Sequence, residues 1–122
     1  MDDLSKINAL YNEGKKEFLD GKYYDAHEVW EDLWSDYYLK DRKFIQGLIQ
    51  LSVSFVHLKN GNMVGAKNLL KKSQAKFLEY EGEHRSINIK RLKIEMSEVE
   101  KEYQSLNNSE EFNWSLVPKL NP

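Results

Sequence analysis

Two short breaks that contain glycine divide the first 80 residues into long stretches whose apolar side chains recur at helical spacing. The breaks are DGKY at residues 20–23 and NGN at residues 60–62. Both prolines lie within the last five residues, so no proline interrupts a helix in the body of the chain. Because such short connections turn successive helices back on one another, the sequence predicts an all-α fold of antiparallel helical hairpins.

We expect about five helices, because the apolar spacing resumes after each break. Their expected ranges are 3–19, 23–38, 42–59, 63–80 and 86–106. We interpret residues 1–106 as a single helical domain and residues 107–122, NNSEEFNWSLVPKLNP, as an irregular C-terminal tail. The length of 122 residues is enough for one domain with one core.

Part of the sequence pattern recurs 40 residues later. FLDGKYYDAHEVW at 18–30 aligns with LKNGNMVGAKNLL at 58–70. The alignment matches a glycine, a large residue, an alanine and a bulky residue: Gly21 with Gly61, Tyr23 with Met63, Ala26 with Ala66, and Trp30 with Leu70. A glycine that reverses the chain and a small residue that lets two helices approach are typical of tetratricopeptide-like hairpins, although that repeat has a period of ~34 residues. We therefore expect tetratricopeptide-like packing.

The composition excludes several classes of protein. Net charge is −5 over residues 1–40, +6 over 41–76 and −3 over 77–122, which indicates neighbouring helices with complementary surfaces. No arginine-rich run is present, so we do not expect a nucleic-acid partner. The absence of cysteine excludes thiolate chemistry. The longest apolar stretch, FIQGLIQLSVSFVHL, is too short for a membrane span and the N-terminus is acidic, so we expect a cytoplasmic protein.

Polar residues on two otherwise apolar helices indicate where a cleft would lie. The expected helix at 42–59 is apolar on most sides but carries one narrow polar arc, and the helix at 23–38 has polar groups at the edge of its apolar face. A buried amide or imidazole without a partner costs about 1–3 kcal/mol, so these edges need polar neighbours or solvent. We predict that they meet in a cleft, and the candidate binding residues are His27, Glu28, Glu31, Trp34, Gln46, Gln50 and His57.

The segment HEVWE at 27–31 allows two interpretations. His27 and Glu31, one helical turn apart, can form a hydrogen-bonded packing pair. They can also ligate a metal ion, with His57 as a third ligand and Glu28 as the base of a metal-assisted hydrolytic enzyme. We favour the packing pair, because a catalytic zinc site usually has three protein ligands and the local spacing supplies two.

These interpretations give two functional hypotheses. The first is a small binding or adaptor module that needs no cofactor and receives a protein or a small molecule in the predicted cleft. Helical-hairpin proteins commonly present such grooves, and the sequence assembles no complete set of nucleophile and base. The second is the metal-assisted enzyme, with His27 and Glu31 at its centre.

A narrow apolar seam follows the last expected helix. Its residues are Ile89, Leu92, Met96, Val99, Tyr103 and Leu106. Alternate spacings of three and four are typical of a helix that packs along one line, as in coiled coils. We expect this seam to pack on the rest of the bundle, and a homodimer through it is the second interpretation.

Three motifs together resemble a known family. The first combines Gly21, Tyr23, Ala26-His27-Glu28, Glu31 and Trp34. The second is Gln46-Gly47-Leu48-Ile49-Gln50, and the third is Gly61-Asn62 followed by Gly65-Ala66. This combination spans roughly residues 18–70 and is similar to the domain of unknown function numbered 309, a family of small all-helical proteins. The resemblance implies an all-α bundle and no established activity.

Overall fold

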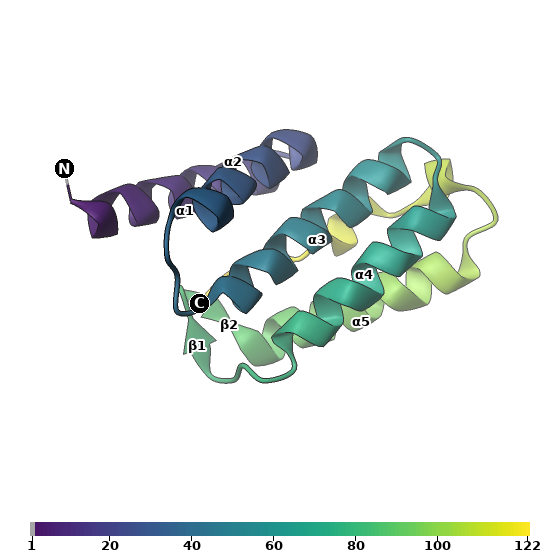
Figure 1. Cartoon of the computed structure of the whole chain (residues 1–122). Helices are drawn as coiled ribbons and strands as arrows, with labels where there is room; N and C mark the ends of the chain where they lie inside the picture. The colour runs from purple at the N-terminus through teal and green to yellow at the C-terminus, as the bar shows by residue number, and fades with distance from the viewer. Residues whose placement is uncertain (1) are drawn as a thin grey trace.

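The computed structural model describes residues 2–122. The α-helices within them are α1 (Asp3–Leu19), α2 (Tyr23–Asp36), α3 (Arg42–Lys59), α4 (Met63–Phe77) and α5 (Ile89–Ser105). Each helix packs mainly on its neighbour in the chain, and the α1–α2 hairpin lies on one side of α3 with α4 and α5 on the other (Figure 1). The predicted all-α fold of about five helices in hairpins is confirmed. Over residues 2–122, no helix combines the length and the apolar character needed to cross a bilayer.

The two glycine turns that the sequence repeats have the same backbone conformation. Gly21 has a φ of 81° and Gly61 a φ of 77°, both in the left-handed region that favours glycine. The next helix begins two residues after each glycine, and the matched alanines, Ala26 and Ala66, are completely buried. The same local sequence therefore produces the α1–α2 turn and the α3–α4 turn.

The expected start of the last helix at residue 86 is wrong, because a short β-hairpin precedes α5. Strand β1 (Glu83–His84) pairs antiparallel with β2 (Ile87–Asn88). The two turn residues between them, Arg85 and Ser86, have φ values of 48° and 61°. Positive φ at both positions suits a two-residue hairpin turn, which is usually marked by Asn-Gly or Asp-Gly. EGEHRSIN at 81–88 carries no such pair, so no local signal predicts the two strands.

The apolar seam of α5 is used inside the bundle. Five of its six residues are at most 1% exposed, and these are Ile89, Leu92, Met96, Val99 and Tyr103. The sixth, Leu106, is partly buried. These side chains contact the core of their own chain, which is the packing that the first interpretation of the seam predicts.

The C-terminal tail packs on the same core. It contains two short 3-10 helices, η1 (Ser109–Glu111) and η2 (Trp114–Leu116). Its Phe112, Val117 and Leu120 are buried among the helices. The end of the chain returns to the β-hairpin, where the backbone N–H of Asn88 donates to the carbonyl oxygen of Asn121. The tail therefore has little regular structure beyond the two 3-10 helices, and its apolar side chains pack it against the bundle.

Helices α1 and α2 approach closely where glycine faces tryptophan. A Cβ atom built on Gly14 would lie 2.2 Å from Nε1 of Trp30. That indole N–H donates to the carbonyl oxygen of Tyr11 at 3.1 Å, and Trp30 is completely buried. Only glycine leaves room on α1 for this ring.

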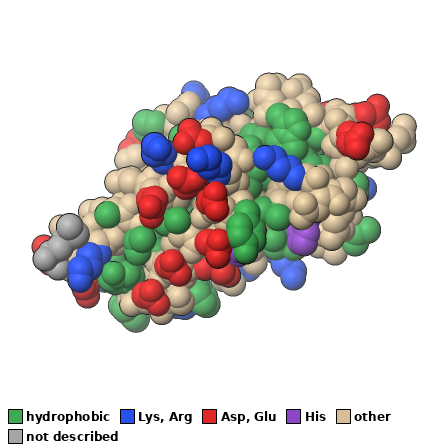
Figure 2. Space-filling view, turned by 90° about the horizontal axis from the view of Figure 1, so that it is seen from above, with side chains coloured by type: hydrophobic (Ala, Val, Ile, Leu, Met, Phe, Trp, Pro, Cys, Tyr) green, Lys and Arg blue, Asp and Glu red, His purple; other side chains and the backbone are tan. Residues whose placement is uncertain are grey.

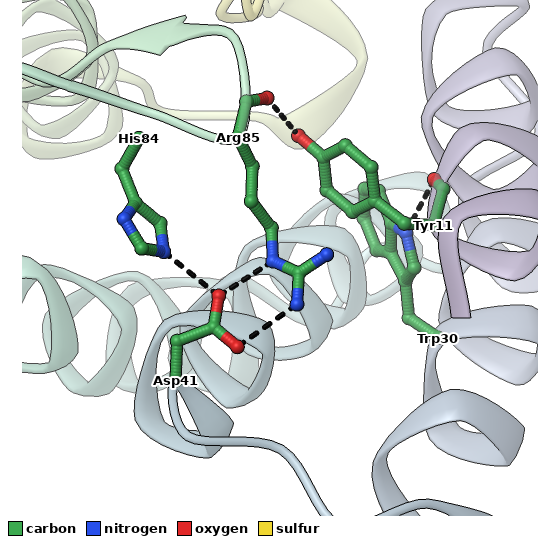
Figure 3. A network of polar contacts seen from close by, with 5 residues as sticks. All are labelled: Tyr11, Trp30, Asp41, His84 and Arg85. Carbon is green, nitrogen blue, oxygen red and sulfur yellow. Dashed lines mark hydrogen bonds and ion pairs between the residues drawn. The ribbon is translucent and has the colours of Figure 1, made fainter. Parts of the chain in front are cut away.

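A polar cluster joins three parts of the chain, and we call Tyr11, Asp41, His84 and Arg85 the clasp (Figure 3). The Arg85 guanidinium donates to both carboxylate oxygens of Asp41, and Nε2 of His84 lies 2.7 Å from Oδ2 of the same carboxylate. The Tyr11 hydroxyl donates to the Arg85 carbonyl oxygen at 2.9 Å. Because Asp41 immediately precedes α3, the clasp ties the α2–α3 connection to both α1 and the β-hairpin.

Replacing Gly14 with alanine should lower the free energy of unfolding by about 2 kcal/mol, because the added methyl group displaces the Trp30 ring. The loss should occur although alanine has the higher helix propensity. Urea denaturation of Gly14→Ala measures it, with Asn12→Ala as the control at an exposed position of the same helix. Equal stability of the two variants would show that α1 does not need the close approach.

The clasp also makes stability depend on pH. Burial raises the pKa of the Asp41 carboxyl, but hydrogen bonds from Arg85 and His84 outweigh burial and leave that pKa below its ordinary value. A carboxyl whose pKa is lower in the folded state stabilises the protein above its unfolded pKa, and this stabilisation disappears as the pH falls through the folded pKa. The side chains of Asp41 and Arg85 are only 13% and 18% exposed, so solvent screens the pair weakly.

We expect Asp41→Asn to lower the free energy of unfolding by about 3 kcal/mol at neutral pH, because it leaves the Arg85 guanidinium without its counterion. The difference from the wild type should shrink as the pH falls below about 4, where the wild-type carboxyl also becomes neutral. Denaturation curves across this pH range measure the effect. Asp32→Asn, at an exposed position of α2, is the control. A wild-type advantage that stayed constant into the acid range would contradict the lowered pKa.

Candidate functional site

The polar edges of α2 and α3 meet in a shallow hollow, which we call the α2–α3 hollow. Its lining residues are His27, Glu31 and Trp34 of α2, Gln46, Ile49, Gln50 and Val53 of α3, and Leu69 of α4. Its volume is about 260 Å³. Sites for drug-sized ligands usually enclose ~300–1,000 Å³, so the α2–α3 hollow suits a smaller group, such as one side chain or a peptide unit.

The structure brings five of the seven predicted cleft residues together and places Glu28 and His57 elsewhere. Glu28 lies on the exposed side of α2. Nδ1 of His57 is 3.4 Å from Nδ2 of Asn62, and its ring lies against Gly65 in the first turn of α4. This corrects the prediction for both residues. The periodicity of α3 puts His57 on the same face as Gln50, but it does not show that α4 already covers that face two turns further along.

His27 and Glu31 lie next to each other on the surface of α2, one helical turn apart. Nδ1 of His27 lies 3.1 Å from the carbonyl oxygen of Tyr24, and Nε2 lies 3.3 Å from Oε2 of Glu31. The ring of His27 is therefore positioned between the backbone of its own helix and the Glu31 carboxylate.

The metal hypothesis requires ligands that the structure does not assemble. Within residues 2–122, no three His, Asp or Glu side chains lie close enough together to hold a metal ion. His57, the expected third ligand, lies beside Asn62, and Glu28, the expected base, does not line the α2–α3 hollow. The pair of His27 and Glu31 supplies only two of the three protein ligands that a catalytic zinc site usually has.

Two polar atoms of the α2–α3 hollow have no hydrogen-bond partner. Across residues 2–122, the buried side-chain nitrogen and oxygen atoms that lack a partner are Nε1 of Trp34 and Oε1 of Gln50. Both belong to residues that line the α2–α3 hollow. Buried polar groups are nearly always paired, and leaving one unpaired costs about 1–3 kcal/mol. One indole donor and one amide acceptor are therefore unused at the same place.

Trp34 is held in position by its neighbour Arg42. The guanidinium carbon of Arg42 lies 4.0 Å from the centroid of the indole ring, which is a cation–π contact. Arg42 follows Asp41 in the chain and opens α3, so the clasp and the ring that lines the α2–α3 hollow are directly linked.

Another hollow lies beside the α1–α2 turn, and its lysine is engaged. Tyr23, Tyr24, Val56 and Lys59 are among its lining residues. The Lys59 ammonium donates to the Gly21 carbonyl oxygen at 3.0 Å and lies 5.1 Å from the centroid of the Tyr23 ring. In the clasp, both oxygens of the Asp41 carboxylate accept hydrogen bonds. Within residues 2–122, the buried side-chain nitrogen and oxygen atoms without a partner belong to residues of the α2–α3 hollow.

The sequence did not identify the apolar part of the lining, which consists of Ile49, Val53 and Leu69. The first two lie within one helical turn of Gln50 on α3, so their position could have been found by extending the polar arc to its neighbours. Leu69 enters from α4, and only the packing of α4 on α3 places it there.

Replacing Gln50 with leucine should raise the free energy of unfolding by about 1 kcal/mol, because it removes a buried oxygen that has no partner. Chemical denaturation measures the change. Gln46→Leu is the matched control, since Gln46 lines the same hollow without a buried unpaired atom, and we expect a smaller change there. If Gln50→Leu were less stable than the wild type, the amide would have a partner that the structure does not reveal.

The comparison with protein families matches the part of the chain that builds the α2–α3 hollow. The sequence model of the family described as "Domain of unknown function (DUF309)" matches residues 11–69. This segment includes every residue that lines the α2–α3 hollow, whereas the β-hairpin, α5 and the tail lie outside it. A search among curated proteins gives no match. Over residues 11–69, just under half of its length, the chain is similar to the DUF309 family of domains of unknown function.

Proposed function

We propose that this protein is a small binding module that receives a hydrogen-bonding group of a partner molecule in the α2–α3 hollow. The observation that carries the proposal is the pair of unpartnered buried atoms, Nε1 of Trp34 and Oε1 of Gln50. Both reduce the stability of the free protein, and a ligand that pairs with them would recover this loss on binding. Functional sites are where such locally unfavourable arrangements are expected.

An amide group has the complementary chemistry. Its carbonyl oxygen accepts from the indole N–H of Trp34, and its N–H donates to the amide oxygen of Gln50. Ile49, Val53 and Leu69 supply an apolar wall beside these two groups. A small hollow with apolar walls and a few convergent polar atoms is the usual form of a specific binding site. A peptide unit with an apolar side chain fits this combination.

Binding includes a side-chain rotation. Trp34 and Gln50 are only partly buried, but their two unpartnered atoms are covered by neighbouring atoms in the present side-chain conformations. The last torsion of a glutamine side chain joins an sp³ and an sp² carbon and has a broad energy minimum. The Gln50 amide can therefore turn toward a ligand at little cost, and the Trp34 ring must also shift against Arg42 to present its N–H.

The proposal predicts that N-acetyl-leucinamide, a neutral molecule with two amides and one apolar side chain, moves the indole N–H resonance of Trp34. NMR titration at millimolar probe concentrations measures the shift. Trp30 and Trp114 are internal references, because the indole of Trp30 already donates to Tyr11 and Trp114 lies outside the hollow. The Trp34 shift should saturate, and the two reference resonances should not follow it.

Val53→Phe fills the α2–α3 hollow and should abolish the saturable shift. Val64→Phe is the matched control, since Val64 is 72% exposed on α4 and does not line the hollow. The function would be contradicted if the probe moved the Trp34 resonance no more than that of Trp114. Unchanged binding in Val53→Phe would place the ligand elsewhere.

A further inference from the structure

Helix α2 carries acidic side chains without basic ones. Its Asp and Glu residues are all exposed, and between Tyr23 and Asp36 there is no Lys or Arg. Over residues 2–122, none of these carboxylates forms an ion pair with a Lys or Arg side chain; the ion pair on α2 is that of Glu31 with His27. Figure 2 shows acidic side chains gathered on this side of the molecule, with several Lys or Arg side chains among them. The α2 part of this face is therefore acidic, whereas α1 also carries lysines.

The acidic surface reaches the α2–α3 hollow at Glu31. The Glu31 side chain lines the hollow and is 57% exposed, so its carboxylate has room for a second partner besides His27. Gln50, whose side-chain oxygen is unpartnered, lines the same hollow. A cationic group of a ligand that enters from the α2 side thus finds a carboxylate on the lining that Gln50 shares.

Glu31 is the one Asp, Glu, Lys or Arg residue among those that line the α2–α3 hollow. Helix α4 contributes Leu69 to the lining, and its lysines lie outside it; two of them, Lys67 and Lys71, line a separate hollow beside α5. Arg42 of α3 is held by its stacking on Trp34. A ligand cation that reaches the hollow is therefore attracted to Glu31 on the α2 side.

We propose that the ligand is a basic segment of a partner protein, in which an arginine side chain pairs with Glu31 while the neighbouring peptide amide occupies the α2–α3 hollow. This inference rests on the proposed function and adds the partner class. Arginine fits better than lysine, because its planar guanidinium donates two parallel hydrogen bonds to one carboxylate. The pair lies at the exposed mouth, so it contributes mainly selectivity and association rate, and the hydrogen bonds in the hollow contribute most of the affinity.

The test compares three capped tripeptides, acetyl-Leu-Arg-Gly-amide and its citrulline and glutamate analogues. Citrulline keeps the shape of arginine but carries no charge. NMR titration of the wild-type protein, read at the Trp34 indole resonance, should give the arginine peptide about fivefold higher affinity than the citrulline peptide at low salt. This preference should decrease as salt is added.

Two matched variants assign the preference to one carboxylate. In Glu31→Gln the arginine and citrulline peptides should bind equally, because the charge at the mouth of the hollow is gone. In Glu28→Gln, which removes an acid from the same helix outside the hollow, most of the preference should remain. An equal loss in the two variants would overturn the role of Glu31.

The remaining outcomes separate this inference from the proposed function. Equal affinity of the arginine and citrulline peptides in the wild type would overturn the basic partner and leave the α2–α3 hollow as an amide-binding site. Tighter binding of the glutamate peptide would also overturn it, in favour of an acidic partner held by α4. If none of the three peptides, nor N-acetyl-leucinamide, moved the Trp34 resonance, both proposals would fall.

Discussion

The carboxylate of Asp41 decides how α2 and α3 are joined, and the candidate site depends on that joint. It receives hydrogen bonds from His84 of β1 and from Arg85 of the hairpin turn, and the hairpin in turn accepts from Tyr11 of α1. Asp41 thereby connects the segment between α2 and α3 to the β-hairpin and, through the hairpin, to α1.

The next residue, Arg42, stacks on Trp34, so the same segment also positions a side chain that lines the α2–α3 hollow. Saturated hydrogen bonding in the clasp and unused hydrogen bonding in the hollow give the two clusters different roles. The clasp stabilises the fold, whereas the hollow has capacity left for a ligand.

The sequence determined local structure well, because local structure follows from neighbouring residues. Gly21 and Gly61 mark turns with the same positive φ, and the helical spacing of apolar residues gave α1 to α4 their starts. The meeting of the polar edges of α2 and α3 was also predictable, since a short connection makes these two helices antiparallel neighbours. The environment of His57 was not, because it depends on how far α4 extends over α3. The clasp was not predictable either: Asp41 and Arg85 are 44 residues apart, and their contact relies on a turn without glycine.

The metal-assisted enzyme and the binding module make different demands on the polar edge of α2. A hydrolytic metal centre needs a third ligand and a base close to His27 and Glu31, and the folded chain directs His57 and Glu28 elsewhere. A binding module needs an accessible depression with unmet hydrogen-bonding groups, and this is what Trp34 and Gln50 provide. Glu31, the one Asp, Glu, Lys or Arg residue of the lining, adds a negative charge on the α2 side, which a neutral pocket would lack.

In the proposed function, the side-chain oxygen of Gln50 lowers the stability of the free protein because it has no partner, and it accepts a hydrogen bond when a ligand binds. The most direct measurement is the affinity of the Gln50→Leu variant for N-acetyl-leucinamide, compared with that of the wild type by the same titration of the Trp34 indole resonance. We expect Gln50→Leu to remain folded and to lose at least about tenfold in affinity, since the ligand N–H then has no acceptor. Unchanged affinity would contradict it, because the unpartnered oxygen would then have no part in binding.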